Sequence, residues 1–280
     1  MRLLYGNPVA QQILREVEAY ARQHPLRLDI ILVGNHEPSR IYVNRKLQQA
    51  SKVGMQAVLH HLPETTSASD LLALIDQLNA DSAVTGMIVQ LPLPGPLEQE
   101  MILERIHPLK DVDGLHPYNI GLLALGRARW APATPWGIVE LLKYYSIVTE
   151  GKHVVVVGRG RLVGTPLALL LSRAAPYGNA TTTLCHTRTS DLYEHTQKAD
   201  IVVVAAGQPR WFPPEGLKPG AIVIDVGIHR VEGQIVGDTH PEVAQAASAL
   251  TPVPGGVGPL TVAALLQNVC KAHQAQTLAQ

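Results

Sequence analysis

The sequence predicts an α/β fold with two domains: an N-terminal α/β domain, and a C-terminal Rossmann-like domain with a parallel sheet. Short buried strands alternate with amphipathic helices in both halves of the chain. A glycine-rich turn follows a strand of four valines, and a proline-containing stretch at 126–135 separates the two halves. The 280 residues are enough for two domains, each with its own core.

The composition excludes several classes of protein. Lysine plus arginine and aspartate plus glutamate number 23 each, so the basic surplus of a nucleic-acid binder is absent. No run of about 18 apolar residues exists, which argues against a membrane span. Gly6 and Pro8 interrupt the N-terminus before an export signal could form. Cys185 and Cys270 are too few for a disulfide framework, so we expect a cytoplasmic protein with two free thiols.

The N-terminal half alternates helices with apolar strands. Apolar residues at helical spacing predict helices over 9–20, from an N-cap at Ser39 to Lys52, and over 71–78. Consecutive apolar residues predict strands at 29–33 and 87–91. Such alternation indicates a parallel sheet covered on both faces.

The C-terminal half repeats this pattern more regularly. A helix is expected over 138–145, and the last helix runs from Thr261 to about Ala275. Strands are expected at 153–157, 181–185, 201–205 and 221–225, with a short one near Leu250. We therefore divide the chain into a domain of residues 1–136, completed by helix 261–280, and a second domain of residues 137–260.

A glycine turn follows the strand at 153–157. Its spacing, Gly158-x-Gly160-x-x-x-Gly164, is one residue longer than the usual dinucleotide fingerprint. Pro166 lies in the first turn of the next helix, where its missing N–H costs nothing. Strand, glycine turn and helix together suit a pyrophosphate, although a purely structural turn remains the alternative.

The end of the second strand favours NADP over NAD. NAD enzymes usually place a carboxylate there for the ribose 2′-hydroxyl, but this strand continues as Cys185-His-Thr187-Arg188-Thr. Arg159 adds a second cation beside the glycine turn. The alternative is that Arg188 is only a solvated loop charge.

Candidate chemical residues lie in the N-terminal half. Tyr42 and Lys46 are four apart on one helix, so they share a face; Val43, Leu47 and Ala50 should pack inward beside them. A surface lysine next to a half-buried tyrosine is the alternative. Gln90 ends an apolar strand and is either a ligand contact or a core amide. The segment 111–114 is most simply a turn, and the His60-His61 pair should point to opposite faces, without a metal.

Together these pieces resemble a known family. The motifs occur in the order Ser39–Lys46, Val89–Pro94, Lys110–Pro117, Gly158–Pro166, Asp225–Ile228 and Thr251–Pro259. They cover nearly the whole chain and closely resemble the bifunctional methylenetetrahydrofolate dehydrogenase/methenyltetrahydrofolate cyclohydrolase family.

The resemblance implies roles for individual residues. Lys46 matches the family's catalytic lysine, Gln90 the glutamine that works with it, and Tyr42 the tyrosine that stacks on the aminobenzoyl ring. Asp113 matches the anchor of the pterin ring. The folate-binding residues implied are Tyr42, Val43, Asn44, Arg45, Lys46, Val89, Gln90, Leu91, Asp113, Pro254, Gly255, Gly256, Val257 and Gly258. The NADP-binding residues implied are Gly158, Arg159, Gly160, Gly164, Thr187, Arg188 and Ile228.

The resemblance also implies two activities in one-carbon metabolism that serve purine biosynthesis, and a homodimer joined through the cofactor domain. Gly160 departs from the family, where serine is common, and so removes a hydroxyl that could bind phosphate. Two alternatives remain: an NADP dehydrogenase of another small substrate, such as shikimate, and a non-catalytic nucleotide sensor.

Overall fold

The computed structural model describes residues 1–278, so Ala279 and Gln280 of the expected segment 261–280 lie outside the described residues. The chain forms two compact units. The first contains Met1–Gln11 and Pro132–Ala264, and the second contains Gln12–Ala131 and Leu265–Gln280. Neither unit is one continuous stretch of chain.

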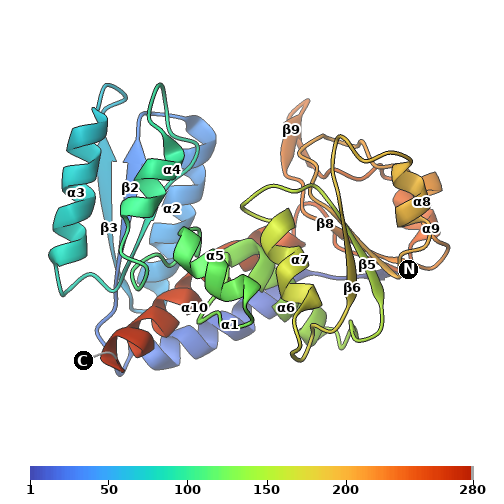
Figure 1. Ribbon diagram of the computed structural model, residues 1–280, viewed down its shortest axis with the longest axis horizontal. Coiled ribbons are helices and arrows are strands. Elements are labelled where there is room, and N and C mark those ends of the chain that lie inside the picture. Colours follow the sequence, from blue (N-terminus) through green and yellow to red (C-terminus); the bar gives the residue numbers. More distant parts are fainter. Residues whose placement is uncertain (279–280) are drawn as a thin grey trace. The chain divides into compact units, whose positions relative to one another are not determined.

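The second unit is built on a parallel three-stranded sheet in the order β3-β2-β4. The strands are β2 (Arg27–Val33), β3 (Gln56–Leu62) and β4 (Gly86–Val89). Helix α2 (Glu37–Lys52) joins β2 to β3, and α3 (Ala68–Ala80) joins β3 to β4 (Figure 1). Helix α4 (Gln99–Arg105) and α3 share one apolar core with the sheet residues Ile31 and Met87, while α2 contacts β2 and β3.

Most elements expected in this half are confirmed, including the first helix, α1 (Gly6–Ala21). The N-cap expected at Ser39 is wrong. The helix begins at Glu37 with His36 as its cap, because Pro38 fits the first helical turn and Ser39 continues that turn. Strand β3 and the helices α4 and α5 (Pro117–Ala124) were not expected from the sequence.

The first unit contains a six-stranded sheet in the order β1-β11-β8-β7-β5-β6, with all pairs parallel. The strands are β1 (Arg2–Leu3), β5 (His153–Val157), β6 (Thr181–Cys185), β7 (Ile201–Val204), β8 (Ile222–Asp225) and β11 (Ala249–Leu250). The chain runs outward from β5 to β6 and then returns to β7 on the other side. Open parallel sheets bind ligands at the carboxyl end of such a reversal.

The helices of this unit are α6 (Ala133–Tyr144), α7 (Gly164–Ser172), α8 (Leu192–Thr196) and α9 (Val243–Ala246), with the 3-10 turn η1 (Pro214–Gly216). Strands β9 (His229–Val231) and β10 (Gln234–Val236) form an antiparallel hairpin. The expected strands and the helix at 138–145 are confirmed. Helix α10 (Val257–Thr277) begins before Thr261, so Val257 and Gly258 are helical rather than part of a loop.

Within residues 1–278, no helix is both long enough and apolar enough to cross a membrane. The two parallel sheets confirm the α/β fold class and the Rossmann-like sheet that we expected from the sequence.

Candidate active site

Lys46 lies in the inward-facing stripe of α2. The buried residues of this helix are Ser39, Val43, Lys46 and Ala50, which recur at helical spacing. Lys46 is only 7% exposed, and burial lowers the pKa of its ammonium group, while the negative charge of Asp113 acts in the opposite direction. Leu47, expected in this stripe, is only half-buried. A charged side chain thus occupies a position that would ordinarily be apolar.

Gln90 directs its amide oxygen at Lys46. Lys46 Nζ donates to Gln90 Oε1 at 3.0 Å, and Gln90 Nε2 donates to the carbonyl oxygen of Leu91 at 2.8 Å. The second bond fixes the amide with its oxygen toward the amine. The carbonyl of Leu91 also accepts a bond from Ser39 Oγ at 3.4 Å. The structure therefore brings Lys46 and Gln90 together, as expected.

Tyr42 lies half-buried one turn before Lys46, and burial raises the pKa of its hydroxyl. The guanidinium carbon of Arg45 lies 5.9 Å from the centre of the Tyr42 ring. Asn44 is exposed, because two residues along a helix rotate a side chain by about 200° away from Tyr42. The structure therefore places Asn44 away from the buried stripe that carries Lys46.

The 110–113 segment contains one side chain that stabilises the fold, Lys110, and one that is available to a ligand, Asp113. Lys110 Nζ donates to the carbonyl oxygens of Leu78, Asn79 and Asp81, at the C-terminal end of α3. Val112 and Asp113 form the expected turn. Asp113 is half-buried, and among the described residues its carboxylate makes no hydrogen bond. It is therefore the carboxylate of this segment that remains available to a ligand.

Asp111 is instead a structural acceptor. It is 2% exposed and accepts bonds from the backbone N–H groups of Leu115 and His116 and from the side-chain amide of Asn119. Burial raises the pKa of its carboxyl, and these hydrogen bonds oppose the rise. Asp111 therefore fixes the backbone that follows Asp113.

Asp111→Ala is expected to destabilise the protein by about 2–4 kcal/mol, because buried donors lose their acceptor. The urea concentration at the midpoint of unfolding should fall clearly in Asp111→Ala. Asp113→Ala should leave this midpoint unchanged and should raise KM for the ligand that the Asp113 carboxylate is expected to bind. Equal midpoints for the two variants would contradict this division between the two aspartates.

The glycine turn after β5 requires two of its three glycines. Gly158 has φ +116°, and an added Cβ would lie 2.1 Å from the carbonyl oxygen of Ala205. A Cβ on Gly164 would lie 1.7 Å from the carbonyl oxygen of Gly158. A Cβ on Gly160 would meet nothing within 4 Å. The turn therefore packs closely at Gly158 and Gly164, while Gly160 leaves open space.

The loop after β6 suits a phosphate better than a ribose diol. Thr187 and Arg188 are exposed, as is Arg159 in the glycine turn. The loop's shape is set by the bond from His186 N to Thr189 Oγ1 at 2.8 Å. No carboxylate lies within 186–190, so the residues present fit NADP. Ile228, just beyond β8, is 45% exposed at the same edge of the sheet.

The segment 254–258 lies in the first unit, whereas Lys46 and Gln90 lie in the second. The Val253–Pro254 peptide is cis, and Gly255 has φ +100°. The carbonyl of Gly255 accepts a bond from Gly6 N at 2.8 Å, and a Cβ on Gly6 would lie 1.8 Å from Gly256 O. This segment therefore packs tightly on the start of α1.

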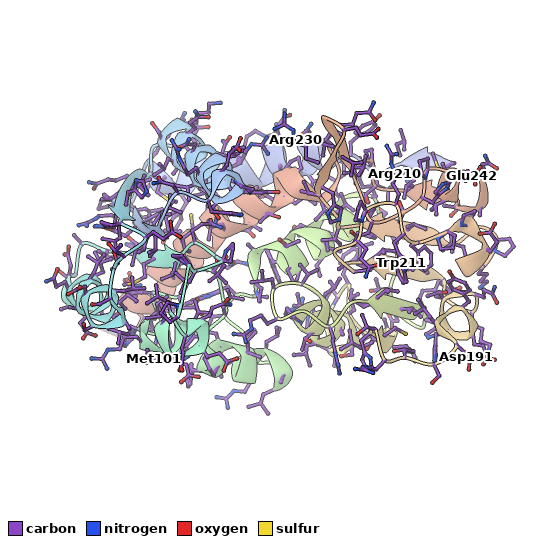
Figure 2. All side chains as sticks on the ribbon, turned by 90° about the horizontal axis from the view of Figure 1, so that it is seen from above. Met101, Asp191, Arg210, Trp211, Arg230 and Glu242 are labelled. Atoms are coloured by element: carbon purple, nitrogen blue, oxygen red, sulfur yellow. The ribbon has the colours of Figure 1, made fainter. Side chains whose placement is uncertain are left out.

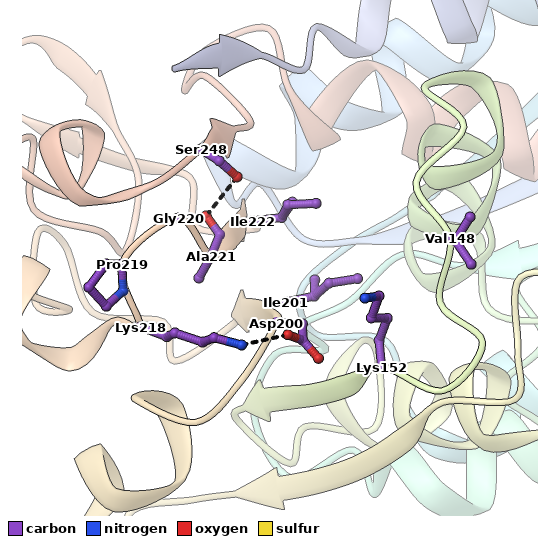
Figure 3. Close-up of a pocket in the computed structure, with 10 residues that line it drawn as sticks. All are labelled: Val148, Lys152, Asp200, Ile201, Lys218, Pro219, Gly220, Ala221, Ile222 and Ser248. Carbon is purple, nitrogen blue, oxygen red and sulfur yellow. Dashed lines mark hydrogen bonds and ion pairs between the residues drawn. The ribbon is translucent and has the colours of Figure 1, made fainter.

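A cavity of about 210 Å³ lies at the opposite edge of the six-stranded sheet, at the amino ends of β7 and β8 (Figure 3). Lys152, Lys218 and Asp200 are its charged lining residues, and Lys218 Nζ lies 2.8 Å from Asp200 Oδ1. Since the glycine turn lies at the carboxyl ends of the strands, this cavity is separate from the predicted cofactor site.

No group of three His, Cys, Asp or Glu side chains that could hold a metal occurs in the described part of the chain. His60 Nε2 contacts Asp29 Oδ1, whereas His61 Nε2 contacts the carbonyl of Gly34. Sequence reasoning gave no role to two buried carboxylates beside the predicted cofactor loops, Asp225 and Asp238. Asp225 ends an apolar strand and begins the motif Asp225–Ile228, whereas Asp238 was missed altogether.

Comparison with known proteins covers almost the whole chain. Residues 4–113 match the tetrahydrofolate dehydrogenase/cyclohydrolase catalytic domain, and residues 132–277 match the NAD(P)-binding domain of the same enzymes. The bifunctional protein FolD of Magnetococcus marinus is 47% identical over 264 residues, which are 93% of this chain and 91% of that protein.

Solved structures of methylenetetrahydrofolate dehydrogenase/cyclohydrolases have the same fold as this chain. The FolD methylenetetrahydrofolate dehydrogenase/cyclohydrolase of Campylobacter jejuni superposes with a TM-score of 0.94 at 42% identity, over 99% of both chains. The Trypanosoma brucei enzyme, solved with NADP and an inhibitor, gives a TM-score of 0.88 at 34% identity, over 97% of this chain and 95% of that one.

Proposed function

This chain belongs to the tetrahydrofolate dehydrogenase/cyclohydrolase family, and we propose that Lys46, Gln90, Tyr42 and Asp113 carry its two reactions. The protein is a bifunctional enzyme. It oxidises 5,10-methylenetetrahydrofolate to the 5,10-methenyl form with NADP, and it hydrolyses that product to 10-formyltetrahydrofolate. Membership of this family displaces the two alternatives, a shikimate-type dehydrogenase and a nucleotide sensor.

The observation that carries the proposed site is the buried amine of Lys46 held 3.0 Å from Gln90 Oε1. A spectrophotometric assay with methylenetetrahydrofolate and each nicotinamide cofactor tests the function, because it follows methenyl formation and cofactor reduction together. Absence of both signals with NADP would contradict it.

Dehydrogenation depends mainly on positioning. The methylene carbon lies between two nitrogens whose lone pairs stabilise the amidinium product, so hydride can leave without a strong base. NADP supplies the hydride acceptor. The half-buried Tyr42 ring supports the aminobenzoyl group, and the Asp113 carboxylate accepts hydrogen bonds from the pterin N–H groups.

Cyclohydrolysis requires proton transfer. Water adds to the methenyl carbon and loses a proton, and the bond to N5 then breaks as that nitrogen gains a proton. Lys46 moves these protons, because burial lowers its pKa and increases the fraction of neutral amine. Gln90 orients the amine, and its amide can hydrogen-bond the developing oxygen.

The proposed NADP residues are Gly158, Arg159, Gly160, Gly164, Thr187, Arg188 and Ile228. The close backbone approach at Gly158 and Gly164 supports a pyrophosphate there. The exposed Arg188, with no carboxylate beside it, supports a 2′-phosphate contact.

Arg188→Ala is expected to raise KM for NADP by about tenfold through loss of a charged hydrogen bond, without changing KM for NAD. Initial rates with both cofactors measure this change. Arg230→Ala is a matched control, because Arg230 is an exposed arginine in β9. An unchanged KM for NADP in Arg188→Ala would mean that Arg188 is only a solvated loop charge and does not bind the 2′-phosphate.

The wider setting also remains a proposal: a cytoplasmic homodimer joined through the cofactor domain, whose 10-formyl product serves purine biosynthesis. Exposed apolar side chains within 137–260, among them Tyr144 and Val148, support an interface there. For the domains, we propose residues 1–136 with 261–280 for folate and 137–260 for NADP. The separate family matches to 4–113 and 132–277 support a boundary between them.

A further inference from the structure

Two fully buried aspartates lie beside the loops that follow β7 and β8. Asp225 ends β8 and is 2% exposed. Its Oδ1 accepts from the N–H groups of Gly227 and Asp238, each at 2.9 Å. Its Oδ2 accepts from the N–H and the hydroxyl of Thr239. Asp225 thus ties the segment after β10 to the end of β8.

Asp238 connects the segment after β10 to the loop that follows β7. Its Oδ2 accepts from the N–H groups of Ala206 and Gly207 at 2.7 and 3.0 Å. Its Oδ1 lies 2.6 Å from His229 Nε2. Asp238 is 0% exposed, so no solvent competes for these bonds and no ligand can reach the carboxylate.

Backbone bonds reinforce the same connection. The carbonyl of Asp238 accepts from Trp211 N at 2.7 Å and Phe212 N at 2.9 Å, and the carbonyl of Gly237 accepts from Arg210 N at 2.9 Å. Figure 2 labels Arg210 and Trp211, which lie on the segment leading away from β7. Asp238 therefore holds this segment through both its side chain and its backbone.

Close packing fixes the carboxylates themselves. A Cβ on Gly227 would lie 2.3 Å from Asp238 Oδ1, and a Cβ on Gly237 would lie 2.0 Å from Asp225 Oδ2. The residue before the Asp238-bound amides, Ala205, is the one whose carbonyl oxygen faces Gly158. The contacts run from Asp238 through the β7 loop to the glycine turn after β5.

We propose that Asp238 is a positioning residue for NADP: its buried carboxylate holds the β7 loop in the conformation against which the glycine turn packs. The inference rests on the proposed placement of NADP at this edge of the sheet. His229 helps to hold the Asp238 carboxylate in place through its contact with Oδ1, the oxygen that the β7 loop does not use. Asp238 does not touch the cofactor, and its effect on binding is carried by Ala205, Ala206 and Gly207.

The test uses the two activities of the same enzyme. Cyclohydrolysis can be measured on the methenyl substrate without NADP, so it reports on the residues of the second unit separately from NADP binding, and circular dichroism of the full chain reports folding. Asp238→Ala is expected to raise KM for NADP by about tenfold, because two buried N–H groups lose their acceptor, and to leave cyclohydrolase turnover unchanged.

Two variants sharpen the result. In Asp238→Asn the amide oxygen can accept from both N–H groups while the amide nitrogen faces His229, so KM should stay close to the original value, within about twofold. Asp200→Ala removes a carboxylate that also accepts a backbone N–H, from His153, but at the opposite edge of the sheet. It should leave KM for NADP unchanged.

Two results would overturn the proposal: an unchanged KM in a folded Asp238→Ala, or a KM in Asp238→Asn as high as in Asp238→Ala. If Asp238→Ala does not fold and loses both activities, the KM for NADP of His229→Ala is measured instead. We expect that KM to rise about threefold. No rise would overturn the proposal. If NADP binds elsewhere, Arg188→Ala will also lack an effect, which distinguishes the two failures.

Discussion

Lys46→Met is expected to lower cyclohydrolase turnover by about 10³-fold, the usual size of a general acid–base contribution. The change keeps an unbranched side chain in the buried stripe of α2 but removes the amine bonded to Gln90. Dehydrogenation should fall much less, because hydride departure needs positioning more than a base. Single-turnover assays of methenyl hydrolysis and of NADP reduction measure the two effects separately.

Lys46→Arg separates proton transfer from charge, since arginine keeps the positive charge but does not release a proton at neutral pH. It should be as inactive in hydrolysis as Lys46→Met. In the unmodified enzyme, a neutral Lys46 accepts the proton, so hydrolysis should rise as pH rises through its lowered pKa. Lys52→Met, which alters an exposed lysine of the same helix, is the control. Full hydrolysis by Lys46→Met would exclude Lys46 as the acid/base.

Gly164→Ala is expected to raise KM for NADP by about 100-fold, because the new Cβ would meet backbone atoms that cannot move aside without opening the turn. These atoms are the carbonyl oxygen of Gly158 at 1.7 Å and its carbon at 2.6 Å. Cyclohydrolase turnover should persist, since it does not use NADP. Initial rates of both reactions, with circular dichroism as the folding check, measure the outcome.

Gly160→Ser is the matched comparison within the same turn. A Cβ at Gly160 meets nothing within 4 Å, and a serine restores the hydroxyl that the resemblance associates with this position. KM for NADP should fall by about two- to fivefold through one added hydrogen bond. A similar rise in KM for both variants would mean that the spacing of the turn, rather than the close approach at Gly164, controls binding.

Elements defined by apolar periodicity were predictable from the sequence. The strands of consecutive apolar residues, such as Val154–Val157 in β5, and the amphipathic α1 were expected near their observed positions. Strand β3 was missed because its exposure alternates and it includes His60 and His61, so it lacks a continuous apolar run. The hairpin of β9 and β10 was also missed, although Gly233 with φ +80° between two short strands is a typical turn signal.

The candidate site was predictable only in part. Spacing along α2 placed Tyr42 and Lys46 on one face, but the resemblance, not the spacing, paired Lys46 with Gln90. The burial of Lys46 in place of Leu47 depends on how α2 packs on its sheet, which local sequence does not define. The bonds of Asp238 to Ala206 and Gly207 join residues more than 30 positions apart through backbone groups, and backbone groups leave no residue-type signal.

The pairing of β1 with β11 has a consequence for synthesis of the chain. Arg2 lies beside Ala249 in the sheet, so β1 leaves the ribosome more than 240 residues before its strand partner is synthesised. Contacts of such long sequence separation slow folding. Until then β1 is an unpaired strand, and an unpaired strand edge is a site for aggregation. Removing residues 1–4 would leave the outer edge of β11 without its partner.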